Sequence, residues 1–293
     1  MISAFIEQHK LPEEFKLTVK QHYKPLADQL FSNFTQGNGA YFVGINGCQG
    51  SGKSTLTDFI AEYLRTKYQL NVAVMSLDDF YLTREKRNKL ANDIHPLLAT
   101  RGVPGTHDVH NLKQILTQLK SQESGFSIPK FNKATDEPFP EEQWTSIKEP
   151  VDIILLEGWC WGVEPQSEEQ LKLPINELEL HHDVSGEWRN YVNQQLKDAY
   201  VPLYKTMDFW LALQAPSFDC VYKWRVEQEK KLQARNFGLA DSKVMTPEEV
   251  LGFTQYFQRL SVQSCNTISQ SADEIFYLDY ARKIKVQPLK EEE

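Results

Sequence analysis

The stretch Gly47-Cys48-Gln49-Gly50-Ser51-Gly52-Lys53-Ser54 decides the fold of this 293-residue chain. It matches the phosphate-binding pattern G-x-x-x-x-G-K-[ST], in which glycines let successive backbone N–H groups converge on phosphate oxygens. The pattern has this meaning only between a buried strand and a helix. Both are expected here, because residues 41–45 are a short apolar run and residues 53–68 have helical periodicity. The sequence therefore predicts a nucleotide-binding P-loop.

The side chains of this loop suit a nucleoside triphosphate with its metal ion. We expect Lys53 to reach the β- and γ-phosphates and the Ser54 hydroxyl to bind Mg²⁺. The helix that begins at Lys53 adds the positive end of its dipole to the same site. The remaining contacts expected with ATP come from Gly47, Gln49, Gly50, Ser51, Gly52 and Thr55.

Strands and helices alternate along most of the chain. Apolar runs predict further strands at residues 72–77, 151–156, 207–213 and 275–278. Helical patterns occur at residues 108–121, 186–205, 217–235 and 247–270. This alternation is typical of a doubly wound α/β fold, in which helices cover both faces of a parallel sheet.

The two ends of the chain and its middle are less typical of this pattern. Residues 1–36 are expected to form an amphipathic helix, and residues 126–142 a loop. We therefore expect one domain over residues 1–293, with an N-terminal helical extension at 1–40 and a core at 41–280.

Composition limits the partners and the compartment. The net charge is −8, from 40 acidic and 32 basic residues, which argues against nucleic acid because phosphate-backbone binding needs a positive field. The chain has no signal peptide pattern and no apolar run long enough to span a membrane. Its four cysteines are scattered, as expected for reduced thiols. We expect a soluble cytoplasmic protein; monomer and homodimer are equally compatible with the sequence.

Acidic residues follow two of the predicted strands. Asp78 and Asp79 follow the strand at 72–77, and Glu157 follows the strand at 151–156. Ligands of doubly wound sheets bind at the carboxyl ends of strands, so both acids lie near the γ-phosphate if these strands flank the P-loop strand. Glu157 is then expected to hold Mg²⁺, and Asp78 to act as the base for an attacking hydroxyl. Helix capping or a solvated turn is the alternative role for Asp78 and Asp79.

Further segments accompany the P-loop: Ser-Leu-Asp-Asp-Phe-Tyr-Leu-Thr (76–83), Arg-Gly-Val-Pro-Gly-Thr-His-Asp (101–108), Ile-Pro-Lys-Phe-Asn-Lys (128–133) and Leu-Glu-Gly-Trp (156–159). Together they resemble the phosphoribulokinase/uridine kinase/pantothenate kinase group, and more closely the D-glycerate 3-kinase family. The resemblance implies a P-loop NTPase fold with a five-stranded parallel core sheet. It also implies ATP and Mg²⁺, a small hydroxy acid such as D-glycerate as the acceptor, and Asp78 as the base.

The acceptor is expected to contact residues in or beside these segments: Tyr81, Arg101, His107, Asp108, Lys130 and Trp159. An arginine such as Arg101 can grip a carboxylate with two hydrogen bonds. Each other residue has a plainer alternative. His107 and Asp108 are also compatible with helix capping, Tyr81 and Trp159 with core packing, and Lys130, like Lys133, with an exposed surface.

Residues 217–240 contain the arginines Arg225 and Arg235 on a predicted helix. In the kinases that this chain resembles, the corresponding helix is a lid over ATP. Arg225 is therefore expected to neutralise charge on the transferred phosphoryl group, and Arg235 to contact ATP. A solvent-exposed helix with i,i+4 ion pairs is the alternative.

Three functions are compatible with these features. The first is an ATP-dependent kinase acting on D-glycerate or a similar hydroxy acid. The second is a nucleoside or pantothenate kinase of the same fold. The third is a regulator that binds ATP without turnover, against which the presence of Asp78, Glu157 and the basic helix counts.

Overall fold

The computed structural model describes residues 1–235 and 245–285, with the side chains of residues 228–235 and 247 outside the description. Within these ranges the main sheet has the strand order β10-β9-β8-β1-β7-β2. Its members are β1 (Tyr41–Gly47), β2 (Val72–Ser76), β7 (Ile153–Gly158), β8 (Phe209–Gln214), β9 (Glu274–Leu278) and β10 (Ile284–Lys285). All pairs are parallel except β10 with β9. The predicted doubly wound fold with five parallel strands is confirmed. The short edge strand β10 was not predicted.

The position of β2 differs from the expected one. Strand β7 lies between β1 and β2, so β2 does not flank the P-loop strand. In the register, Glu157 on β7 is opposite Ile45 on β1 and Ser76 on β2. The acid after β2 is therefore separated from the P-loop by two strand spacings, each about 4.8 Å. This distance leaves room for reacting groups between the P-loop and Asp78.

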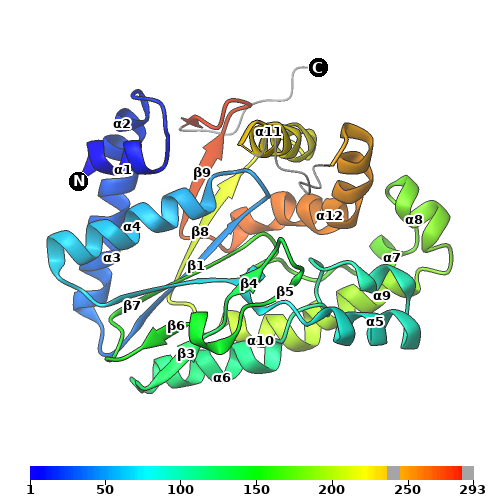
Figure 1. Ribbon diagram of the computed structural model, residues 1–293, viewed down its shortest axis with the longest axis horizontal. Helices are drawn as coiled ribbons and strands as arrows, with labels where there is room; N and C mark the ends of the chain where they lie inside the picture. The colour runs from blue at the N-terminus through cyan, green and yellow to red at the C-terminus, as the bar shows by residue number, and fades with distance from the viewer. Residues whose placement is uncertain (236–244, 286–293) are drawn as a thin grey trace.

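Helices cover both faces of the sheet (Figure 1), and one hydrophobic cluster lies on each face. The first face carries α3 (Lys24–Gln36), α4 (Lys53–Tyr68) and the start of α11 (Asp219–Arg235). The second carries α6 (Val109–Lys120), α9 (Glu187–Gln195), α10 (Val201–Tyr204) and part of α12 (Pro247–Thr267). The bounds of α4 agree with the prediction. Helix α12 begins with a capping box, in which Thr246 and Glu249 bind each other's backbone N–H groups.

The predicted helix over residues 1–36 was wrong as one continuous element. Residues 2–36 form α1 (Ile2–Gln8), α2 (Phe15–Thr18), a π-helical turn (Val19–Tyr23) and α3. The break after α1 contains Lys10, which has a φ of 53°, and Pro12, which lacks a backbone N–H. The apolar side chains still reach the core: Phe5 and Leu30 are fully buried in the cluster that contains α4.

The middle of the chain also contains structure that the sequence did not indicate. Residues 126–147 form two small antiparallel pairs, β3 (Phe126–Ile128) with β6 (Thr145–Ile147) and β4 (Phe131–Asn132) with β5 (Glu137–Pro138). These strands are too short to produce a recognisable alternation. The remaining helices are α5 (Arg84–Asp93), α7 (Glu168–Leu171) and α8 (Glu177–His182). No helix in the described ranges is long and apolar enough to cross a membrane.

Candidate active site

The P-loop lies between β1 and α4 and has the backbone that a phosphate cradle needs. Gly50 and Gly52 have φ values of 79° and 95°, which favour glycine. The Lys53 ammonium lies 3.2 Å from the Cys48 carbonyl oxygen and 3.8 Å from Glu157 Oε2. The buried polar atoms Gln49 Oε1 and Ser51 Oγ have no hydrogen-bond partner among the described residues. The open backbone geometry and the uncommitted Ser51 hydroxyl, which can donate a hydrogen bond, both fit a bound triphosphate.

Glu157 is joined to two hydroxyl groups. Its Oε1 accepts hydrogen bonds from Ser54 Oγ at 3.1 Å and from Ser76 Oγ at 3.2 Å. Carboxylate and hydroxyl oxygens are the hard ligands that Mg²⁺ takes from proteins. The expected pair Ser54 and Glu157 is therefore together, which fits a Mg²⁺ site. Ser76 was missed as a functional residue, although it stands opposite Glu157 in the sheet and begins the segment 76–83.

Asp78 lies on the 3₁₀ turn Leu77–Phe80 that follows β2. Its Oδ1 accepts a hydrogen bond from the Tyr81 hydroxyl at 2.8 Å, and its Oδ2 accepts one from the Lys133 ammonium at 2.6 Å. Burial raises the pKa of the Asp78 carboxyl, but the charge and hydrogen bond of Lys133 outweigh burial and lower it. Asp78 is therefore ionised at neutral pH and able to accept a proton.

Asp79 contacts the β4–β5 hairpin (residues 131–138), which contains Lys133 and directly follows Lys130. Its Oδ1 accepts a hydrogen bond from the Phe131 backbone N–H at 3.1 Å, and Lys130 lies 3.8 Å from its Oδ2. Burial raises the pKa of Asp79. Lys130 thus faces Asp79, and Lys133 contacts the candidate base. Both side chains also agree with the surface alternative, because 41% of Lys130 and 59% of Lys133 is exposed.

The segment 101–108 has hydrogen bonds within itself and one to Leu82, which follows β2. Gly102 has a φ of 139°, and a Cβ there would lie 2.4 Å from the Phe257 ring. The fully buried Thr106 hydroxyl donates to the Val103 carbonyl at 2.7 Å and accepts from the Gly102 N–H at 3.0 Å. The Thr106 carbonyl accepts a hydrogen bond from Leu82 N–H at 2.9 Å. The segment therefore has one conformation beside the candidate base.

His107 and Tyr81 meet where these two segments pair. Their rings stack with centroids 4.6 Å apart and an interplanar angle of 26°. Burial lowers the pKa of His107 to about 4, although the Asp78 charge acts in the opposite direction. Tyr81 is 7% exposed, and its hydroxyl points to Asp78. Tyr81 thus contacts the candidate base and His107 stacks on Tyr81, while a substrate contact of either residue stays a prediction.

Arg101 lies near the hairpin but already has a carboxylate partner. Its Nη1 is 2.5 Å from Asp136 Oδ1, and Asp136 Oδ2 also accepts a hydrogen bond from Arg87 at 2.7 Å. Burial raises the pKa of Asp136, but the hydrogen bond from Arg87 and the charge of Arg101 outweigh it and lower the pKa. Any substrate contact of Arg101 has to compete with Asp136, which the sequence did not indicate.

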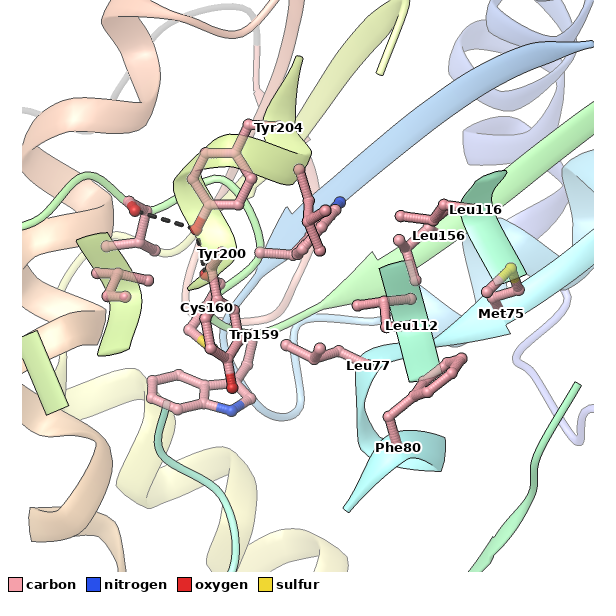
Figure 2. Packing of buried hydrophobic residues seen from close by; sticks show 14 of the residues in the cluster. Met75, Leu77, Phe80, Leu112, Leu116, Leu156, Trp159, Cys160, Tyr200 and Tyr204 are labelled. Atoms are coloured by element: carbon pink, nitrogen blue, oxygen red, sulfur yellow. Dashed lines mark hydrogen bonds between the residues drawn. The ribbon is translucent and has the colours of Figure 1, made fainter. Parts of the chain in front are cut away.

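Two expected substrate residues make structural contacts instead of facing the base directly. Trp159 is buried at the end of β7 (Figure 2). Its Nε1 donates to the Gly102 carbonyl at 3.1 Å, which holds the segment 101–108 there. Asp108 caps α6 by accepting the Asn111 N–H at 3.1 Å, and lies 3.8 Å from the Lys86 ammonium. These contacts correspond to the alternatives of packing and capping. A substrate contact for either residue stays a prediction.

The expected lid helix is α11. The Arg225 guanidinium lies 5.6 Å from the centre of the Phe253 ring on α12. The side chain of Arg235 and residues 236–240 of the expected lid lie outside the described part of the chain. The roles of both arginines as lid residues stay predictions.

Arg282, in the turn between β9 and β10, was not expected to be near the nucleotide site. Its Nε donates to the Gly50 carbonyl of the P-loop at 2.8 Å, and its Nη2 to Glu227 of α11 at 2.7 Å. Its guanidinium also lies 5.0 Å from the Trp224 ring. Arg282 therefore connects the P-loop with α11. No sequence motif marks it.

Comparison with known proteins agrees with this geometry. No protein-family model matches the chain. An uncharacterised kinase of Schizosaccharomyces pombe is 33% identical over 243 residues, which cover 78% of this chain and 82% of that protein. The chloroplastic D-glycerate 3-kinase of Arabidopsis thaliana is 28% identical over 256 residues, 79% of this chain and 54% of that protein.

The solved structure of a D-glycerate 3-kinase from Cryptococcus neoformans superimposes with a TM-score of 0.76 at 27% identity, covering 90% of this chain and 97% of that one. The P-loop, the acids after β2 and β7, and these similarities lead to one conclusion. The chain belongs to the family of ATP-dependent P-loop kinases that includes D-glycerate 3-kinase and the uncharacterised fungal kinase.

Proposed function

We propose that this small-molecule kinase transfers the γ-phosphoryl group of ATP to a hydroxyl of a small hydroxy acid, with D-glycerate as the first candidate. The observation that carries the proposal is the position of Asp78. Its carboxylate is held between Tyr81 and Lys133, one strand away from the Glu157 carboxylate that binds Ser54. The candidate base and the candidate metal-binding acid thus lie at the carboxyl ends of neighbouring strands, which supports the proposal.

This arrangement supports direct transfer. The acceptor hydroxyl oxygen forms a bond to the γ-phosphorus, its proton passes to Asp78, and the bond to the β-phosphate oxygen breaks to release ADP. Lys53 and the P-loop N–H groups hold the phosphates in position. Mg²⁺ bound by Ser54 and Glu157 would neutralise charge on the phosphate oxygens.

A negatively charged acceptor suits the side chains around the base. Lys133 contacts Asp78 and Lys130 contacts Asp79. Arg101 pairs with Asp136, and its guanidinium lies 5.7 Å from the centre of the Phe131 ring. Lys133, Phe131 and Asp136 belong to the hairpin 131–138, Lys130 directly precedes it, and Arg101 lies against it. An acceptor carboxylate can take hydrogen bonds from Lys133 beside Asp78, or from Arg101 in place of Asp136. The 28% and 27% identities with D-glycerate 3-kinases support the same choice of acceptor.

The test is an ADP-release assay with Mg-ATP against D-glycerate, L-glycerate, pantothenate, uridine and ribulose 5-phosphate. D-glycerate should be turned over, and Asp78→Asn should abolish turnover while ATP affinity stays nearly unchanged. Turnover of uridine or pantothenate without glycerate would select the nucleoside or pantothenate kinase instead. ATP binding without any turnover would favour a regulator. Cytoplasmic location, the absence of nucleic acid and membrane partners, and the choice between monomer and homodimer stay predictions.

A further inference from the structure

Within the described residues the His107 imidazole makes one hydrogen bond, and its partner comes from a distant part of the chain. His107 Nδ1 lies 2.7 Å from the hydroxyl oxygen of Tyr200. Tyr200 is fully buried and ends the π-helical turn Leu196–Tyr200, between α9 and α10. Turns of this kind interrupt α-helices rarely and are frequent at functional sites. Residues 160–205 contain no motif that suggested such a role.

The direction of this hydrogen bond can be worked out from the contacts of Tyr200. Its hydroxyl oxygen accepts the Gly105 backbone N–H at 3.3 Å. Burial raises the pKa of Tyr200 well above its usual value, so the hydroxyl keeps its proton. Among the described residues, His107 Nδ1 is the only acceptor recorded for that proton. We therefore assign the Tyr200 O–H group as the donor and His107 Nδ1 as the acceptor without a proton.

The proton of the neutral ring is then on Nε2. The low pKa of His107, about 4, keeps the ring neutral at pH 7. Nε2 is buried and has no hydrogen-bond partner in the described part of the chain. A buried N–H group without a partner is costly, by about 1–3 kcal/mol, and such groups often mark the place of a missing ligand or water.

This N–H group belongs to the acceptor side of the site. The His107 ring stacks on Tyr81, and the Tyr81 hydroxyl is bound to Asp78. The Asp78 charge acts on the imidazole, which places the two groups within electrostatic reach. The nucleotide side is built from different residues, namely the P-loop, Ser54 and Glu157.

We infer that His107 Nε2–H donates a hydrogen bond to an oxygen of the acceptor substrate, and that Tyr200 is a positioning residue that holds His107 in this tautomer. The inference rests on the proposed function, in which the acceptor is a small hydroxy acid with carboxylate and hydroxyl oxygens. A neutral donor here adds directional recognition to the charge of Lys133 without lowering the basicity of Asp78 further.

The kinetic test uses Tyr200→Phe, which removes only the hydroxyl, with Tyr204→Phe as the matched control. Tyr204 lies beside Tyr200 in the same cluster (Figure 2), and its buried hydroxyl donates to the Val163 carbonyl at 3.1 Å. We expect Tyr200→Phe to raise the acceptor KM by about five- to thirtyfold, the effect of one hydrogen bond, with the KM for ATP unchanged. Tyr204→Phe should leave both KM values unchanged. Equal changes in both variants, or an unchanged acceptor KM in folded Tyr200→Phe, would overturn the inference.

Two substitutions at His107 test whether the Nε2 donor, and not the presence of the imidazole ring, is what the substrate needs. The amide nitrogen of Gln can occupy the position of Nε2, whereas Asn reaches only the position of Nδ1. His107→Gln should therefore retain more kcat/KM for the acceptor than His107→Asn, by about tenfold. Equal losses in the two variants would contradict a donor role for Nε2.

A spectroscopic measurement tests the tautomer without turnover. With ¹⁵N-labelled histidine, the ring signals of His107 can be assigned among the seven histidines by their loss in His107→Gln. We expect an Nε2–H ring in the wild type and a mixture of tautomers in Tyr200→Phe. Addition of the accepted substrate should shift the Nε2 signal. An Nδ1–H ring, or an Nε2 signal that ignores the substrate, would overturn the inference.

The two proposals fail in different ways. If the wild type does not phosphorylate D-glycerate, the proposed acceptor is wrong, and the variants are measured with the acceptor from the panel that is turned over. The tautomer measurement needs no acceptor substrate, so it still decides whether Tyr200 determines the tautomer of His107. Turnover of D-glycerate with normal kinetics in Tyr200→Phe would preserve the proposed function and remove this inference.

Discussion

The Lys133 ammonium donates a hydrogen bond to Asp78 Oδ2 over 2.6 Å, so the candidate base is paired with a cation from a separate hairpin. The pair gives Lys133 two roles. It keeps Asp78 ionised, and it brings a positive charge to the place where an acceptor carboxylate would bind. The Lys133 side chain is itself 59% exposed, so solvent screens both effects in part.

Lys133→Met should shift the pH dependence of the kinase reaction. Lys133 lowers the pKa of Asp78, so its removal raises that pKa. Activity needs ionised Asp78, and the acidic limb of kcat/KM should therefore move to higher pH, by about one unit. The acceptor KM should also rise. Lys67→Met, which breaks a remote pair with Asp28 at 2.9 Å, is the control. An acidic limb at the wild-type position would show that Lys133 does not act on the base.

Ser76→Ala should weaken the response to Mg²⁺. The Ser76 hydroxyl orients Glu157 at 3.2 Å, and removal of such an outer partner costs about tenfold in metal affinity. The Mg²⁺ concentration for half-maximal ADP release should rise accordingly. Ser76→Thr keeps the hydroxyl and should retain most of the affinity. If the alanine variant responds to Mg²⁺ like the wild type, the orientation of Glu157 does not depend on Ser76.

Arg282→Gln should weaken ATP binding and spare the acceptor. The variant loses the charge-assisted bond to the Gly50 carbonyl, and with it one support of the P-loop. We expect the KM for ATP to rise by about tenfold. Glu227→Gln keeps the bond between Arg282 and Gly50 and is the matched control, expected to change the KM for ATP less. An equal effect of both variants would assign the loss to α11 instead of the P-loop.

Arg259→Met should destabilise the fold strongly. Arg259 on α12 binds both carboxylate oxygens of Glu179, which is fully buried on α8. The substitution leaves a buried carboxylate without its cation, which costs about 3–5 kcal/mol in the free energy of unfolding. Urea unfolding measures the difference. The double variant Arg259→Met/Glu179→Leu removes both charges and should recover most of the loss. A double variant as unstable as the single one would show that packing, and not the unpaired charge, is responsible.

Features that depend on residues close together in the chain could be predicted. The P-loop is one, because a few successive backbone groups and the start of α4 form the phosphate cradle. The capping box of α12 is another, since Thr246 and Glu249 are three residues apart. Buried strands such as β7 are recognisable because strands that are covered on both faces consist of nearly continuous apolar residues.

The order of the strands and the partners of the site residues could not be predicted in this way. The position of β7 between β1 and β2 results from how crossovers pack, and apolar runs do not encode it. The bonds of the site join residues far apart in sequence: Lys133 and Asp78 are separated by 55 positions, His107 and Tyr200 by 93, and Arg282 and Gly50 by 232.

Local sequence patterns were sufficient to predict the nucleotide-binding loop, the parallel α/β fold and the two candidate acids. The contact of Lys133 with Asp78, the pairing of Arg101 with Asp136, and the contacts of Tyr200 and Arg282 became visible only in the folded chain. The difference arises because backbone conformation and burial depend on local pattern. A side-chain hydrogen bond, in contrast, needs two groups brought within about 3 Å, and the packing of the whole chain sets that distance.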